Sequence, residues 1–153
     1  MLTQDKGLKG FKLSILGTDY YVRCVKSIDM PDWYFKENKG YCDHTVKTIT
    51  VEDLSERRND YNDILGDLEE ITNQTMRHEI VHAFLRESGL GDESDIDEIF
   101  IDWLALQAPK IFKAFCQAKA LSNEQIKECT EAFNRQNIKE SGDINGNTRI
   151  TNQ

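Results

Sequence analysis

The hydrophobic pattern of this chain changes its period once, about a third of the way along, and this change limits the folds that it can adopt. Residues 11–16 alternate apolar with polar side chains, and residues 20–25 are rich in aromatic and β-branched ones, as strands are. Beyond residue 59 the apolar residues recur at steps of three and four, as they do along a helix face. We therefore expect an α+β fold, in which a small, mostly antiparallel N-terminal sheet precedes the helices.

Four strands are expected in two pairs. The first pair, 11–16 and 20–25, turns at Gly17-Thr18, where the glycine tolerates a positive φ. The second pair is 40–42 and 46–51, with the turn between them.

The longest helical pattern runs from about residue 59 or 60 to Ser88, and Gly89 is a typical residue after a helix end. This helix is apolar on two sides, which favours a central position. The next helix is expected to start at Ser94, with Asp97 as its capping-box partner. Pro109 is expected to kink or split it.

A last amphipathic helix is expected from Ser122 to about Lys139, and residues 141–153 are expected to form a flexible polar tail. Neither an internal repeat nor a linker is visible. For a chain of 153 residues this predicts one domain, residues 1–140, followed by the tail.

The charge excludes some functions. The net charge of −8 disfavours direct binding to a nucleic-acid backbone or to an anionic membrane surface, since either requires a basic face. No apolar run approaches the length of a membrane span, and the N-terminus is polar and has no signal-peptide core. We therefore expect a cytoplasmic protein whose four cysteines are free thiols.

The most specific motif is His78-Glu79-Ile80-Val81-His82, an H-E-x-x-H sequence within the long helical pattern. Residues four apart lie one turn apart on the same helix face, so His78 and His82 can bind one metal ion. Glu79 projects to the side, where it can take a proton from a water molecule that the metal activates. The pattern predicts one zinc ion per chain, with Glu79 as general base.

A zinc site of this type needs a third protein ligand. No histidine follows His82, so the third ligand is an acid or, as a weaker alternative, His44. Glu98 is the favoured acid, because Asp102 follows it one turn later and can orient a liganding imidazole. Asp97 and Asp95 remain alternatives.

The histidine motif, followed by Glu98-x-x-x-Asp102, resembles the gluzincin branch of the zincin metallopeptidases. It is most similar to small phage- or prophage-encoded zincin-like proteins, and more distantly to ImmA/IrrE-type peptidases. The resemblance covers roughly residues 11–115. It implies a minimal zincin-like fold, an active-site helix, and a zinc site of His78, His82 and Glu98. It also implies a cleft edged by a strand, here 46–51, that holds a protein or peptide substrate in extended form.

Gluzincins often stabilise the oxyanion with a downstream histidine or tyrosine, and this chain has neither after His82. Tyr41, His44, Tyr34 and Arg77 are the candidates to replace it. Two functions therefore follow: a zinc metallopeptidase, most simply an endopeptidase, or a catalytically idle module that keeps a structural zinc and binds a partner.

Overall fold

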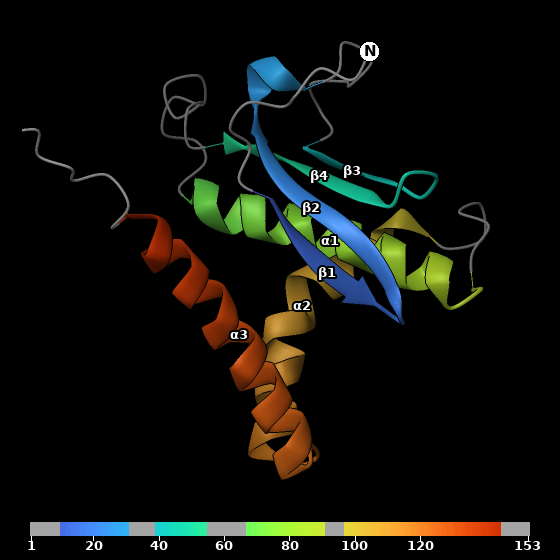
Figure 1. Ribbon diagram of the computed structural model, residues 1–153. Helices are drawn as coiled ribbons and strands as arrows, with labels where there is room; N and C mark the ends of the chain where they lie inside the picture. Colours follow the sequence, from blue (N-terminus) through green and yellow to red (C-terminus); the bar gives the residue numbers. More distant parts are fainter. Residues whose placement is uncertain (1–9, 31–38, 55–66, 91–96, 145–153) are drawn as a thin grey trace, which may run out of the picture. The chain divides into compact units, whose positions relative to one another are not determined.

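The computed structural model describes residues 10–30, 39–54, 67–90 and 97–144. The chain divides into two compact units, Met1–Ala108 and Pro109–Gln153, and each is described by itself. The first unit contains the sheet, the first helix and the start of the second helix; the second unit contains the remaining helical residues (Figure 1). The expected α+β fold is confirmed.

The sheet has four strands in the order β1-β2-β4-β3. They are β1 (Gly10–Ile15), β2 (Thr18–Lys26), β3 (Gly40–Asp43) and β4 (Thr48–Asp53). Both expected antiparallel pairs are present, and a parallel pairing of β2 with β4 joins them. A short 3₁₀ helix, Ser27–Asp29, follows β2. The first turn lies one residue earlier than expected, because Leu16 (φ 50°) and Gly17 (φ 89°) adopt the two positive φ angles that a tight hairpin needs.

The position of β4 corrects one expectation. The substrate-holding strand was predicted at 46–51, but β4 begins at Thr48 and lies between β2 and β3, so both of its edges are paired. Val46 lies in the preceding turn and is 67% exposed. Of the described strands, β3 is the edge strand of that half of the sheet.

Helix α1 (Leu68–Glu87) lies along one face of the sheet (Figure 1). It begins later than the predicted residue 59 or 60, because the Asp67 side chain accepts a hydrogen bond from the Glu70 N–H and caps the helix. Residues 55–66, on which the earlier start was predicted, lie outside the described ranges. The predicted stop at Gly89 is confirmed, with φ 73° and its N–H bonded to the Arg86 carbonyl.

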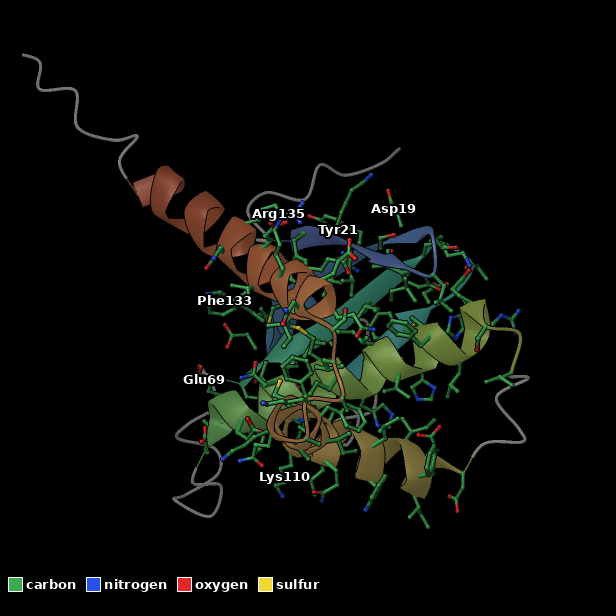
Figure 2. All side chains as sticks on the ribbon, turned by 90° about the horizontal axis from the view of Figure 1, so that it is seen from below. Asp19, Tyr21, Glu69, Lys110, Phe133 and Arg135 are labelled. Atoms are coloured by element: carbon green, nitrogen blue, oxygen red, sulfur yellow. The ribbon has the colours of Figure 1, made fainter. Side chains whose placement is uncertain are left out.

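The core lies between α1 and the sheet. Its fully buried members are Ile15, Tyr20, Val22, Ile49, Val51 and Ala83, with Met76 and Ile80 of α1 packed against them. Side chains alternate across each strand, and Asp19 and Tyr21 point to the face away from α1 (Figure 2). The side of α1 that faces the sheet is therefore buried in the core, as expected for a central helix.

Helix α2 (Glu98–Gln117) starts at Glu98 and not at Ser94. The Asp97 carboxylate accepts a hydrogen bond from the Ile99 N–H (3.0 Å) and so caps the helix itself. Pro109 does not split α2, which continues through it. Ser94 lies outside the described ranges.

Helix α3 (Asn123–Ile144) begins after Ser122, as expected, with reciprocal hydrogen bonds between Ser122 and Gln125. It extends to Ile144, five residues beyond Lys139, and so enters the segment predicted as tail. The four cysteines are thiols, not disulfides. Among the described residues, no helix has the length and apolarity needed to cross a membrane.

Candidate metal centre

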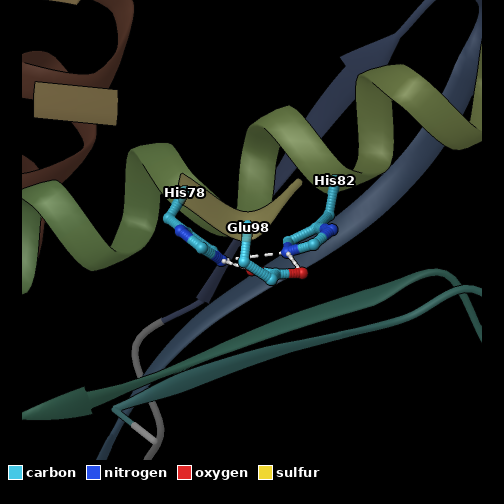
Figure 3. Close-up of side chains that lie close together, drawn as sticks. All are labelled: His78, His82 and Glu98. Carbon is cyan, nitrogen blue, oxygen red and sulfur yellow. Dashed lines mark hydrogen bonds and ion pairs between the residues drawn. The ribbon is translucent and has the colours of Figure 1, made fainter. Parts of the chain in front are cut away.

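His78 and His82 project from the same face of α1, one turn apart (Figure 3). Their ring centroids are 4.7 Å apart, and their Nε2 atoms are 2.9 Å apart. Both side chains are mostly buried, with 18% and 14% exposed. The α-helical spacing thus directs two imidazole nitrogens to one point, as the motif predicts.

Glu98, the first residue of α2, places its side chain between the two imidazoles (Figure 3). Its Oε2 lies 3.3 Å from His78 Nε2, and its Oε1 lies 3.6 Å from His82 Nε2. Its side chain is 62% exposed, so the carboxylate forms the solvent side of the cluster. His78, His82 and Glu98 are therefore a group that could hold a metal ion, with one donor atom from each within 4.8 Å of the others.

The spacing of these donors fits zinc. A tetrahedral ion with bonds of about 2.0–2.1 Å holds neighbouring ligand atoms about 3.3 Å apart. The distances of 2.9, 3.3 and 3.6 Å lie around that value. Two imidazoles and one carboxylate also form the ligand set of zinc sites that keep a fourth position open.

Asp102, one turn after Glu98 on α2, makes the second contact with His78. Its Oδ1 lies 2.8 Å from His78 Nδ1. An ionised carboxylate only accepts hydrogen bonds, so Nδ1 is the donor in this contact, and in the neutral ring Nε2 then has the lone pair that a metal ion needs. Asp102 thereby directs the correct nitrogen of His78 toward the cluster, the orienting position predicted for it.

Glu79 lies beside the cluster and is not part of the three-residue group. Glu79 is only 6% exposed. Its carboxylate lies against Gly40 of β3, since a Cβ atom added to Gly40 would be 3.0 Å from Glu79 Oε1. Both border a cavity of about 390 Å³. The cavity is lined by Gly40, Tyr41 and Cys42 of β3, by His78, Glu79 and His82 of α1, and by Glu98 of α2. A buried carboxylate, three metal donors and an edge strand therefore surround one cavity.

Of the residues considered for the oxyanion, Tyr41 and Arg77 are directed elsewhere. Tyr41 is opposite Thr50 on β4, and Thr50 is opposite Arg23 on β2. The side chains at these positions lie on the face away from α1, and Arg23 Nη2 is 3.5 Å from the Tyr41 hydroxyl. Tyr41 thus borders the cavity, but its side chain faces away from α1. Arg77 donates from Nε to the Ala105 carbonyl of α2.

Two of the four remaining candidates, His44 and Asp97, lie within the described residues. His44 lies in the turn after β3, with Nδ1 3.5 Å from Cys42 Sγ, and is not in the three-residue metal group. Asp97 caps α2. Tyr34 and Asp95 lie outside the described residues.

Sequence reasoning missed the contributions of Gly40 and Cys42 to the cavity. Gly40 was expected only as the first residue of a strand, and Cys42 only as the end of that strand and a thiol. No local signal marks either as a site residue, since their position follows from the pairing of β3 with β4.

No family model matches the chain, and neither a curated protein nor a solved structure shows a significant match to it.

Proposed function

We propose that this protein is a zinc-dependent metallopeptidase, most simply an endopeptidase, in which His78, His82 and Glu98 hold one zinc ion and Glu79 is the general base. The observation that carries the proposal is the buried Glu79 carboxylate, which borders the same cavity as the three donors without belonging to their group. A structural zinc site needs no such carboxylate. The resemblance of the two helical motifs to gluzincins, and to small phage or prophage zincin-like proteins, supports the same conclusion.

The bound zinc ion would polarise the scissile carbonyl and lower the pKa of water toward about 7. Glu79 accepts a proton from the attacking water and passes it to the nitrogen of the leaving amine. Burial beside β3 holds the Glu79 side chain in place for both transfers. Asp102 keeps His78 in the tautomer that the site requires.

The substrate is a peptide in extended conformation, and β3 takes the role that was assigned to residues 46–51. The Glu52 N–H donates to the Lys39 carbonyl across the β3–β4 ladder. In an antiparallel ladder, the main-chain N–H and C=O groups of successive residues point alternately toward the partner strand and away from it. The main-chain groups of Gly40 therefore point away from β4, on the edge that borders the cavity.

We also propose that the protein is cytoplasmic, since its four cysteines form no disulfide and a reducing compartment keeps thiols in that form.

The second candidate function is a module that binds a partner and uses zinc only to hold α1 and α2 together. The positions of Tyr41 and Arg77 favour it, since neither side chain is aimed at the cluster as an oxyanion donor.

Glu79→Gln separates the two functions. The variant is expected to bind one zinc ion as the parent does and to lose hydrolysis, because an amide cannot accept the proton. Glu69→Gln, an exposed change on the same helix, is the matched control and is expected to retain both. Zinc content is measured by metal analysis, and hydrolysis by cleavage of a quenched fluorescent peptide library. A zinc-loaded parent that cleaves nothing in the library favours the binding module, and loss of zinc from Glu79→Gln makes Glu79 a ligand.

A further inference from the structure

Arg77, the residue before the first motif histidine, connects α1 to α2. Its Nε donates to the Ala105 carbonyl at 2.7 Å, and its Nη2 lies 2.6 Å from Glu70 Oε1. The arginine side chain is 24% exposed, whereas Glu70 is 52% exposed. The better-shielded contact of the guanidinium is therefore the one to the α2 backbone.

The Ala105 carbonyl accepts this hydrogen bond because of the proline four residues later. In an α-helix the carbonyl of residue 105 accepts from the N–H of residue 109. Residue 109 is Pro109, which has no N–H, so this carbonyl lacks its usual partner within the helix. Ala105 is fully buried, and an unsatisfied buried carbonyl is costly. Arg77 supplies the missing donor.

The contact acts on the part of α2 that carries the metal-site residues. Asp102 precedes Ala105 by three residues and Glu98 precedes it by seven, so all three lie on one side of the helix. On α1, Arg77 is adjacent to His78, which contacts both Asp102 (2.8 Å) and Glu98 (3.3 Å). One hydrogen bond to the α2 backbone thus fixes the axial position of α2 next to the two contacts that complete the cluster.

We propose that Arg77 is a positioning residue of the metal centre, and that the carbonyl freed by Pro109 is the point at which it holds α2. The inference rests on the metal site of the proposed function and does not require hydrolysis. Its specific consequence is that Arg77 and Pro109 are coupled: the proline creates the acceptor that the arginine uses.

The experiment is a double-mutant cycle of Arg77→Gln and Pro109→Ala, with zinc affinity measured by chelator competition and folding by thermal unfolding without metal. Glu70→Gln is the control, because it removes the exposed partner of the same guanidinium. Arg77→Gln is expected to weaken zinc binding about 10- to 100-fold, as loss of a supporting contact does. Glu70→Gln is expected to change it less than about 3-fold, since exposed ion pairs contribute little.

Pro109→Ala restores an N–H that can bond the Ala105 carbonyl. In that background Arg77→Gln is expected to recover most of its lost thermal stability, because the carbonyl is satisfied again. Zinc affinity is expected to stay low, because α2 is no longer held to α1. A Co²⁺-substituted sample provides a second readout, since a displaced ligand alters its visible absorption spectrum.

Three results overturn the inference: Arg77→Gln that binds zinc within about 3-fold of the parent, a double variant that recovers affinity together with stability, and a parent that binds no zinc. The last result also removes the proposed function. A parent that binds zinc but cleaves no peptide removes only the peptidase and leaves the inference standing. If Arg77→Gln does not fold alone, the double variant compared with Pro109→Ala decides the question.

Discussion

His78 Nδ1 and Asp102 Oδ1 lie 2.8 Å apart, across the interface between α1 and α2. Because the carboxylate can only accept, this contact sets the tautomer of His78 and leaves Nε2 as the atom that faces His82 and Glu98. The contact also holds the start of α2 against α1. Asp102 therefore affects both the tautomer of His78 and the position of Glu98.

Asp102→Asn tests this relationship. An amide oxygen can still accept from Nδ1 but carries no charge, so zinc affinity is expected to fall by about 10- to 100-fold. Chelator competition measures the change, and Asp97→Asn is the control, because asparagine is an equally good helix cap. Equal zinc affinity in Asp102→Asn and the parent would remove the orienting role.

Glu98→Ala is expected to weaken zinc binding more than Asp102→Asn does, beyond about 100-fold, because a ligand is removed and not merely its support. Metal analysis after gel filtration measures the retained zinc. Asp97→Ala is the matched control, since Asp97 adjoins Glu98 but its carboxylate is bonded to the Ile99 N–H. If Asp97→Ala loses zinc and Glu98→Ala keeps it, Asp97 is the ligand. If both keep it, Asp95→Ala is measured next, and His44 becomes the leading candidate only if none of the three acids matters.

The sequence could predict those features that depend on neighbours along one element. Spacing along a helix places His78 and His82 on one face, and the same rule places Asp102 one turn after Glu98. Alternation predicted the strand at 11–16, and aromatic and β-branched content predicted the one at 20–25. Each of these inferences requires only the residues of a single helix or strand.

The features that could not be predicted depend on which elements meet. The sequence predicts a strand near 46–51 but not that β4 lies between β2 and β3, because strand order is set by contacts distant in the sequence. The role of Arg77 has the same origin. In the sequence, the only sign of this role is Pro109, four residues after Ala105. The proline shows that the Ala105 carbonyl lacks its usual partner, but not which residue donates to it.

Gly40→Ala tests the packing of Glu79 against β3. The added Cβ would lie 2.7 Å from Thr75 Cγ2 and 3.0 Å from Glu79 Oε1, so both side chains must shift. We expect a loss of about 1–3 kcal/mol in the free energy of unfolding, as overpacking typically causes. Peptide hydrolysis is expected to fall while zinc stays bound, because no metal donor is in the contact.

Thr75→Ser, combined with Gly40→Ala, removes the nearer of the two contacts. Urea unfolding is expected to show partial recovery of stability, while hydrolysis stays low because the contact with Glu79 remains. If hydrolysis recovers together with stability, the effect of Gly40→Ala is general destabilisation and not displacement of Glu79.

The last prediction concerns Glu87, an acid at the C-terminal end of α1, where the helix dipole disfavours a negative charge. Three donors offset this: Lys47 Nζ (2.6 Å), Thr18 Oγ1 (2.7 Å) and the Tyr20 hydroxyl (2.8 Å). The hydrogen bond from Lys47, followed by those from Thr18 and Tyr20, lowers the pKa of Glu87 from 4.5 to about 2. The group connects the end of the motif helix to β2 and to the β3–β4 turn.

A carboxyl group whose pKa is lower in the folded state stabilises the fold fully above its unfolded-state pKa, and this contribution is lost as the pH falls through the folded-state pKa. The stability from Glu87 is therefore expected to decline between about pH 4.5 and about pH 2. Glu87→Gln keeps an acceptor but has no charge to titrate, so its unfolding curves are expected to depend less on pH across this range. Urea unfolding with a chelator present measures this without interference from zinc release. The difference between parent and variant should shrink toward pH 2, and a difference that stays constant from pH 6 to pH 2 would show that the charge of Glu87 does not stabilise the fold.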